Sequence, residues 1–205
     1  QWLGLTNSNL NTQGISGSIP ITGINSGVGF FVLRDHVGHQ SMIYTGLDFA
    51  YRFGFGDFSL GLGVRGGATF GKLDGAKLRA PEGTYGGGVI DHSDAILPQS
   101  ASNGIGGDLG FGLHLEGKGL RLGFGMTHLM SSPVNIDFPG GSTQITIART
   151  FSFSAGYDIA VSRVVEIPVD FFIRTDFVRT QMDFQARVVF NQNLWVGLSA
   201  RGYSN

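Results

Sequence analysis

The sequence has no cysteine, few charged residues and no long apolar run. Without cysteine, the 205 residues can form neither a disulfide bond nor a thiolate metal site. Charged residues make up 14% of the chain, whereas an average soluble domain has about 25%. No stretch approaches the roughly 18 consecutive apolar residues of a transmembrane helix, so we expect no such helix. The net charge of −1 gives no reason to expect nucleic acid as a partner.

Glycine and phenylalanine are abundant instead, with 34 and 17 residues, and apolar residues recur at every second position. The pattern is plainest in one segment, whose alternating apolar residues are Phe58, Leu60, Leu62, Val64, Ala68 and Phe70. Successive side chains of a β-strand point to opposite faces, so this segment predicts a strand with one apolar face and one small or polar face. Its length is near the roughly ten residues that a tilted strand needs to cross a bilayer.

The same alternation recurs in about ten segments along the chain. These segments are 13–21, 27–37, 40–55, 58–71, 105–115, 120–128, 151–159, 165–174, 182–190 and 194–201. Such repetition is typical of outer-membrane barrels. We therefore predict an all-β fold, a transmembrane antiparallel β-barrel of outer-membrane type that forms a single domain over residues 1–205. Its apolar face makes outer-membrane lipid an expected neighbour.

The lengths of the connections support the barrel. In outer-membrane barrels, short turns alternate with longer loops that gather on the outer rim. The two longest predicted connections, 72–103 and 131–143, fall on the same rim by this alternation. We expect both to be surface loops. Because long loops without regular structure are often functional or disordered, we interpret 72–103 as a mobile loop that contacts a partner.

Both ends of the chain predict an incomplete barrel. Trp2 reads as the end of a strand whose beginning is absent, and Asn205 directly follows a strand without an evident closing partner. An open sheet edge in lipid leaves backbone groups unpaired, so we expect further strands or another chain at these edges. The start at Gln1 lacks the basic and then apolar pattern of a signal peptide, as expected of a processed or truncated chain.

The face opposite the apolar one carries acids and bases together, and it would line the lumen. Its candidate polar residues are Asp48, Arg52, Arg65, Asp108, His114, Arg121, Asp158, Glu166, Asp170, Arg174, Asp183, Arg187 and Arg201. One interpretation is a salt-bridged, hydrated interior that only stabilises the barrel. The other is a lumen that binds or passes something polar. The many glycines on this face either leave room for an inserted segment or relieve crowding in a curved sheet.

Motifs of catalytic or cofactor sites are weak in this sequence. The stretch 61–66 matches G-x-G-x-x-G, but a dinucleotide site needs a helix after these glycines and the strand pattern continues through them. Two His/Asp groups, around His36 and His92, lack a third ligand at a known metal spacing, so solvated turns are expected there. No G-x-S-x-G motif occurs. We therefore predict no catalytic, cofactor-binding or metal-binding residue.

An ordered series of short motifs resembles the PorP/SprF family of Bacteroidetes outer-membrane proteins. After Gln1-Trp2, the motifs are SGSIPI at 16–21, GVGFFV at 27–32, RDHVG at 34–38, FAYR at 49–52, the glycine-rich stretch 104–112, the Gly-Phe-Gly-Met strand at 123–126, RTF at 149–151, AGY at 155–157, LWVG at 194–197 and ARGY at 200–203. Each motif is short, but together they span essentially the whole chain in a fixed order.

The resemblance implies a non-enzymatic outer-membrane barrel of the type IX secretion and gliding motility system of a Gram-negative bacterium. Its expected partners are type IX secretion components and a secreted surface adhesin, bound and anchored through the adhesin's C-terminal domain. The family has no catalytic motif to transfer to this chain. A passive channel for small or hydrophobic molecules shares every barrel feature and stays open. A soluble β-sandwich is also open, although water would not tolerate its apolar outer band without a partner.

Overall fold

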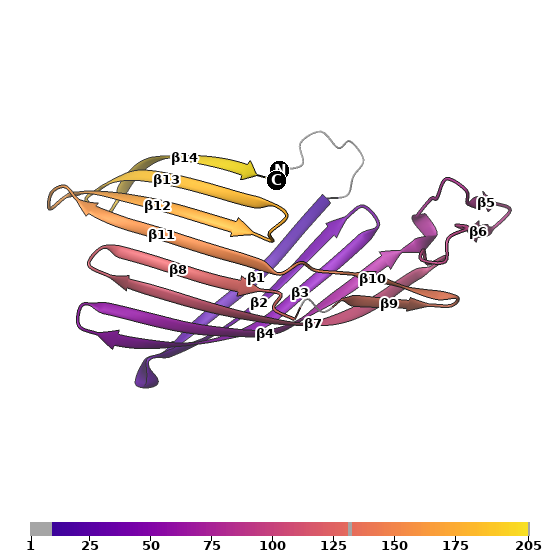
Figure 1. Cartoon of the computed structure of the whole chain (residues 1–205), viewed down its shortest axis with the longest axis horizontal. Coiled ribbons are helices and arrows are strands. Elements are labelled where there is room, and N and C mark those ends of the chain that lie inside the picture. The colour runs from indigo at the N-terminus through magenta and orange to yellow at the C-terminus, as the bar shows by residue number, and fades with distance from the viewer. Residues whose placement is uncertain (1–9, 131–132, 205) are drawn as a thin grey trace.

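The computed structural model describes residues 10–130 and 133–204 of the chain, and in this part the fold is all-β. Its main feature is one long antiparallel sheet in which neighbours along the chain pair with each other, apart from inserted hairpins (Figure 1). In sheet order its strands are β1 (Leu10–Ile21), β2 (Ser26–Val37), β3 (Gln40–Phe55), β4 (Phe58–Asp74), β7 (Ala101–Gly117), β8 (Leu120–Thr127), β11 (Thr150–Ala160), β12 (Val165–Thr175), β13 (Thr180–Phe190) and β14 (Leu194–Ser204). The predicted all-β fold and its long strands are confirmed.

The register of the sheet follows from the alternation and from tight turns. The two-residue turn between β3 and β4 pairs Phe55 with Phe58, and this pairing continues along both strands. Val64 therefore lies opposite Phe49 on one side and Phe111 on the other, so three apolar side chains share one face. A slip of one residue would turn every side chain to the other face, which explains why alternation on each strand specifies one register.

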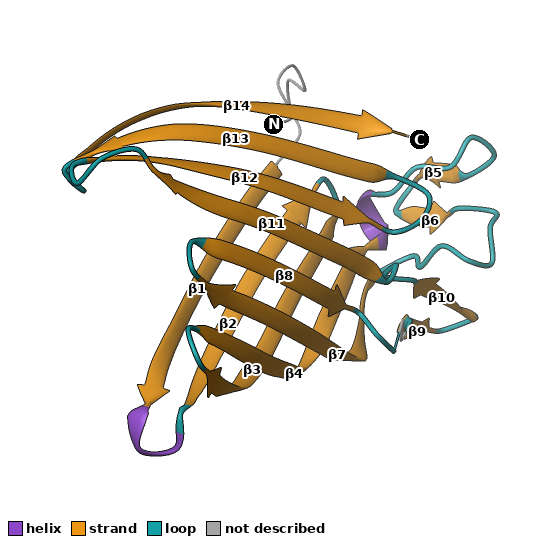
Figure 2. Ribbon diagram, turned by 60° about the vertical axis from the view of Figure 1, so that its left-hand side comes forward, coloured by secondary structure: helices purple, strands orange, loops and turns teal. Residues whose placement is uncertain are grey.

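The sheet is strongly curved, so that it has a concave inner face and a convex outer face (Figure 2). Strands β1 and β14 are its two edges, and no pairing joins them within the described residues. The sheet is therefore not closed. The strand end expected at Trp2 lies outside the described residues. Within 10–130 and 133–204, no helical segment has the length and apolar character needed to cross a membrane.

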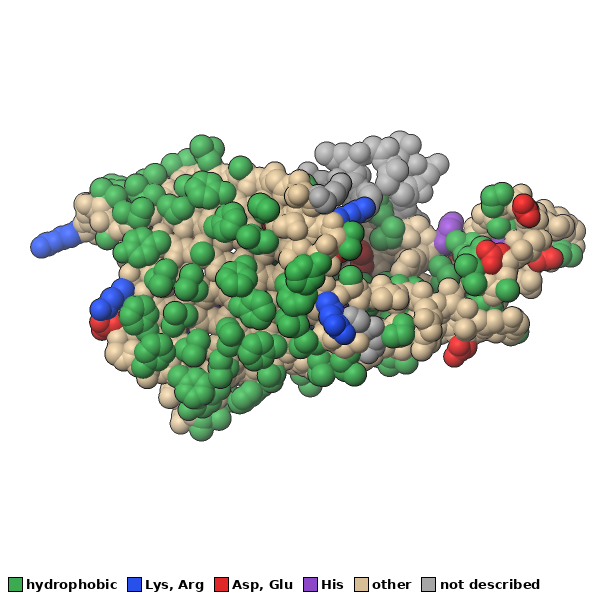
Figure 3. Space-filling view, in the orientation of Figure 1, with side chains coloured by type: hydrophobic (Ala, Val, Ile, Leu, Met, Phe, Trp, Pro, Cys, Tyr) green, Lys and Arg blue, Asp and Glu red, His purple; other side chains and the backbone are tan. Residues whose placement is uncertain are grey.

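On the side seen in Figure 3, apolar side chains cover the outer face of the sheet and charged side chains lie toward its ends. Val64 is 54% exposed and Leu198 is 85% exposed. Among the described residues, the buried hydrophobic side chains are only Met42, Val134 and Ile136. The alternating apolar residues thus form no conventional interior core, and most of their surface faces outward.

The two ends of the sheet differ in their connections. At one end are short turns, including the 3-10 turn η1 (Thr22–Ile24). The other end carries both long connections, as predicted, and they project beyond the sheet (Figures 1 and 2). They are not structureless, because they contain η2 (Gly75–Lys77) and the hairpins β5 (Thr84–Gly86)–β6 (Val89–Asp91) and β9 (Val134–Phe138)–β10 (Gly141–Ile145). The strands β4 and β7 also extend into the predicted loop 72–103.

Candidate functional site

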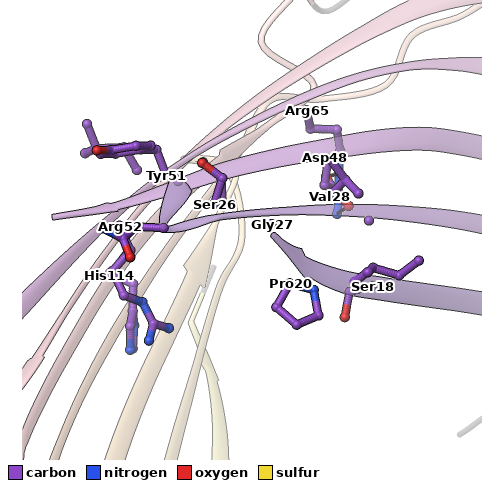
Figure 4. A pocket seen from close by; sticks show the side chains of 18 of the residues that line it. Ser18, Pro20, Ser26, Gly27, Val28, Asp48, Tyr51, Arg52, Arg65 and His114 are labelled. Carbon is purple, nitrogen blue, oxygen red and sulfur yellow. Dashed lines mark hydrogen bonds and ion pairs between the residues drawn. The ribbon is translucent and has the colours of Figure 1, made fainter. Parts of the chain in front are cut away.

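A cavity lies against the inner face of β1–β4 and β7, toward the short-turn end. It measures about 1130 Å³, and we call it the trough (Figure 4). Ser18 and Gly27 lie on the side of β1 and β2, whereas Arg52 and His114 come from β3 and β7. Because alternate residues of each strand face inward, small residues from several strands together leave this volume open.

The inward glycines have two different effects on this surface. A Cβ at Gly61, Gly63 or Gly112 would meet its nearest neighbour only at 3.7–3.9 Å, which is an ordinary contact. These glycines therefore leave room that a larger side chain would fill. By contrast, a Cβ at Gly46 would overlap the Phe31 ring, and one at Gly67 would overlap the Thr45 carbonyl. Some inward glycines thus leave space, and others permit a close approach that a side chain would prevent.

An ion pair between β3 and β4 crosses the inner face beside the trough. Arg65 donates from Nε to Asp48 Oδ1 at 2.6 Å and from Nη2 to Asp48 Oδ2 at 3.0 Å. The guanidinium also lies over the Phe31 ring of β2, with Cζ 4.3 Å from the ring centroid. Two parallel charge-assisted hydrogen bonds and a cation–π contact hold this side chain in one position.

Charged side chains at the short-turn end of the trough are more loosely held. Arg52 Nη1 lies 3.6 Å from Glu116 Oε1, and His114 Nε2 lies 3.5 Å from Glu116 Oε2. The Arg52 and His114 side chains are 65% and 50% exposed. Exposed pairs of this kind contribute little to stability, so these groups can exchange their contacts for those of a ligand.

A second polar cluster joins four strands on the same inner face. Arg121 on β8 donates to Asp158 on β11, and its Nη2 donates to Asp170 on β12 at 2.8 Å. Asp170 also accepts from Arg187 Nη2 on β13 at 3.3 Å. Two acids and two bases thus balance one another across neighbouring strands. At the edge, Arg201 pairs with Asp183 through two hydrogen bonds of 2.6 and 3.2 Å.

Most of the predicted polar residues therefore meet a partner, but some partners were missed. Glu116 and His128 were not predicted; His128 Nδ1 lies 3.1 Å from Asp108 Oδ2. The predicted strand 105–115 stopped one residue before Glu116, which has the same parity as His114. His128 has the parity of the apolar face and lies just after the end of β8, so alternation did not select it. Arg174 lies over the Phe172 ring at 5.6 Å. Glu166 pairs with Val189 in register, and no ion pair joins it to the other predicted residues.

A separate structure forms in the long connections, and we call residues 75–100 and 133–149 the loop cap. Inside it, His92 is 1% exposed and its Nε2 lies 3.0 Å from the carbonyls of both Gly75 and Pro98. Carbonyls only accept, so Nε2 donates, and in the neutral ring Nδ1 accepts from the Tyr85 hydroxyl at 2.9 Å. The imidazole thereby ties the base of the loop to β5.

The group around His92 and the glycine motif 61–66 each lie in a defined structural setting. Both ring nitrogens of His92 are engaged, and no three His, Cys, Asp or Glu side chains in the described residues could hold a metal ion. The glycine motif 61–66 lies in the middle of β4, so no helix N-terminus follows it. The arrangement has a glycine-lined hollow with charged side chains on its wall, and a folded cap at the other end.

A comparison with protein-family models gives a match for this chain. The family model described as "Type IX secretion system membrane protein PorP/SprF" matches residues 1–205, the whole chain. No curated protein has a significant sequence match to it.

Proposed function

We propose the following function for this chain, which belongs to the PorP/SprF family of type IX secretion system membrane proteins. The chain is a non-enzymatic outer-membrane β-barrel protein of the secretion and gliding motility system. It binds a secreted cell-surface adhesin through the adhesin's C-terminal domain and holds it at the surface. Outer-membrane lipid and other secretion components surround it. The observation that carries the membrane placement is the outward apolar face of the sheet.

The dimensions of that face support the placement. On β4 the outward side chains stay apolar or small from Phe58 to Phe70. At about 3.3 Å per residue this stretch covers about 40 Å along the strand, or about 28 Å across a bilayer at a tilt of about 45°. The apolar band of outer-membrane barrels is about 25 Å tall. Each Val, Leu, Ile or Phe left in water instead would forfeit about 1.5–3 kcal/mol.

The loop cap is the surface that best suits an adhesin domain. Long loops of outer-membrane barrels face the cell exterior, where a secreted adhesin is held. The cap is folded by the His92 contacts, so a partner need not order it, and this lowers the cost of binding. Two of its apolar side chains, Val89 and Ile96, are 55% and 60% exposed.

A pull-down of the tagged full-length protein in mild detergent, analysed by mass spectrometry, tests this proposal. We expect a large secreted adhesin or secretion components to co-purify. Replacing Val89 and Ile96 together by Glu should remove the adhesin. The matched control replaces Ile24 and Val161 together by Glu, because these two apolar residues are similarly exposed but lie in the short turns at the opposite end of the sheet. Only variants that insert into the membrane equally are compared.

Two results would contradict the proposal. One is recovery of the barrel alone from native membranes that contain displayed adhesins. The other is unchanged adhesin display on cells that lack the protein. The second candidate function is a passive channel, and the polar trough is the observation that favours it.

A further inference from the structure

The hairpin β9–β10 makes the only buried apolar cluster among the described residues. Val134 and Ile136 on β9 are 0% exposed, and Met42 on β3 is 5% exposed. Tyr44, Leu73, Ile145 and Ile147 pack against these three residues. Because most large apolar side chains of this protein are at least partly exposed, this buried cluster indicates that the hairpin is held in one place.

The cluster lies on the inner face of the sheet. Met42 is an even-numbered residue of β3 and shares its face with Asp48, which points to the trough. On β4, Gly71 has the same parity as Arg65. A Cβ at Gly71 would lie 2.8 Å from Val134 Cγ1, so the hairpin rests directly on the inner wall.

Backbone pairing also holds the hairpin in place. Strand β9 pairs with β7 at Gly104 and Ile105, where β8 no longer covers that edge. A side chain at Gly104 would overlap the Asn135 carbonyl, so this close approach requires glycine. Immediately after β8, His128 pairs with Asp108 of β7 and lies beside the Tyr44 ring. The hairpin is thus held by contacts just before it and by backbone pairing in the middle of β9.

The two parts of the loop cap meet over this end of the sheet. The carbonyl oxygen of Ala95 lies so near Gly141 that a Cβ there would be only 2.5 Å away. The trough, in contrast, is lined by residues of the turn 22–25 and by residues from β1, β2, β3, β4 and β7 in their halves nearer the short turns. The inner face of β3, β4 and β7 is therefore covered by the hairpin near the long loops and hollow near the short turns.

We propose that the β9–β10 hairpin is a plug that closes the long-loop end, so that the trough is a vestibule open only toward the short turns. The proposal rests on the proposed placement as an outer-membrane barrel. Because short turns face the periplasm in such barrels, the vestibule admits a periplasmic segment or solute but does not pass it to the exterior. The plug therefore distinguishes the two candidate functions, because a vestibule that is closed toward the exterior can bind a ligand but cannot act as a channel.

Planar-bilayer recordings of the full-length protein test the plug. We expect no steady conductance from the wild type and discrete conductance steps from Val134→Asp combined with Ile136→Asp, because two buried carboxylates would displace the hairpin. The control is Asn135→Asp, an exposed residue of the same strand that should stay silent. Steady conductance of the wild type would overturn the proposal, and so would a silent double variant that inserts normally.

A cross-link measures the packing itself and does not depend on conductance. Gly71→Cys with Val134→Cys places two thiols together in a chain that has no other cysteine. We expect a disulfide to form on mild oxidation in native membranes, and its absence would overturn the plug. Failure of the wild type to fractionate with membranes would instead contradict the proposed function, while the cross-link still tests the hairpin.

Discussion

A charge placed in the middle of the outward face tests the membrane placement most directly. Val64 lies halfway between Phe58 and Phe70 on β4, so it lies about 14 Å in depth from either end of the apolar stretch. Its cross-strand neighbours Phe49 and Phe111 are apolar. An arginine at this position would have no acid beside it and would point into hydrocarbon.

For Val64→Arg we expect a loss of about 2–4 kcal/mol in the free energy of unfolding, the cost of Arg at the bilayer midplane of a barrel. Phe58→Arg is the control on the same face of the same strand. At the interface the cost falls to about 0–1 kcal/mol, and Lys118 Nζ already lies 5.9 Å from the Phe58 ring centroid.

Equilibrium unfolding in urea, with the full-length protein folded into lipid vesicles, measures both values. The depth dependence is the decisive quantity, because a general loss of packing would affect both positions. Equal costs at Val64 and Phe58, or a neutral effect at Val64, would refute the reasoning. The outward face would then contact water or another protein instead of lipid.

Three further changes have expected outcomes. Asp48→Asn leaves Arg65 without its bidentate partner. Since both side chains are about one-third exposed, we expect the urea titration to show a loss of about 1–2 kcal/mol in the free energy of unfolding. An unchanged urea midpoint would contradict this expectation. Gly46→Ala pushes a methyl group into a ring on β2 and should cost about 1–3 kcal/mol, whereas Gly54→Ala, with open space around it, should not. In the turn after β12, the backbone N–H groups of Arg179 and Val178 donate to Asp176 and lower the pKa of its carboxyl. The ionised carboxyl therefore stabilises the folded protein at a pH above the unfolded pKa of about 4. This stabilisation is lost as the pH falls through the lower folded pKa. The difference in Tm between wild type and Asp176→Ala should therefore shrink in acid, and a difference that is independent of pH would count against this.

The pairing of Asp48 with Arg65 shows what can be predicted from local sequence. Alternation places both residues on the inner face, and the two-residue turn after Phe55 sets them opposite each other. The contact of Arg121 with Asp170 could not be predicted in this way. It crosses β11, so it depends on the curvature of the sheet as well as on the register of single hairpins.

The alternation of apolar residues predicted the structure of the loop cap least well. Strand β9 has only five residues, and a pattern this short does not separate a strand from a loop. The burial of Val134 depends on Met42, more than ninety positions earlier in the chain. The role of Gly104 likewise depends on Asn135, which approaches it only in the folded chain.

The sequence by itself determined the ten long strands, their antiparallel order and the face to which most of their side chains point. These properties depend on the two-residue period of the extended backbone and on tight turns, which are local. Only the tertiary structure decided which inward glycines leave space, which charges meet and where the inner face is filled. Those outcomes depend on contacts between distant segments, and the period of a single strand carries no information about them.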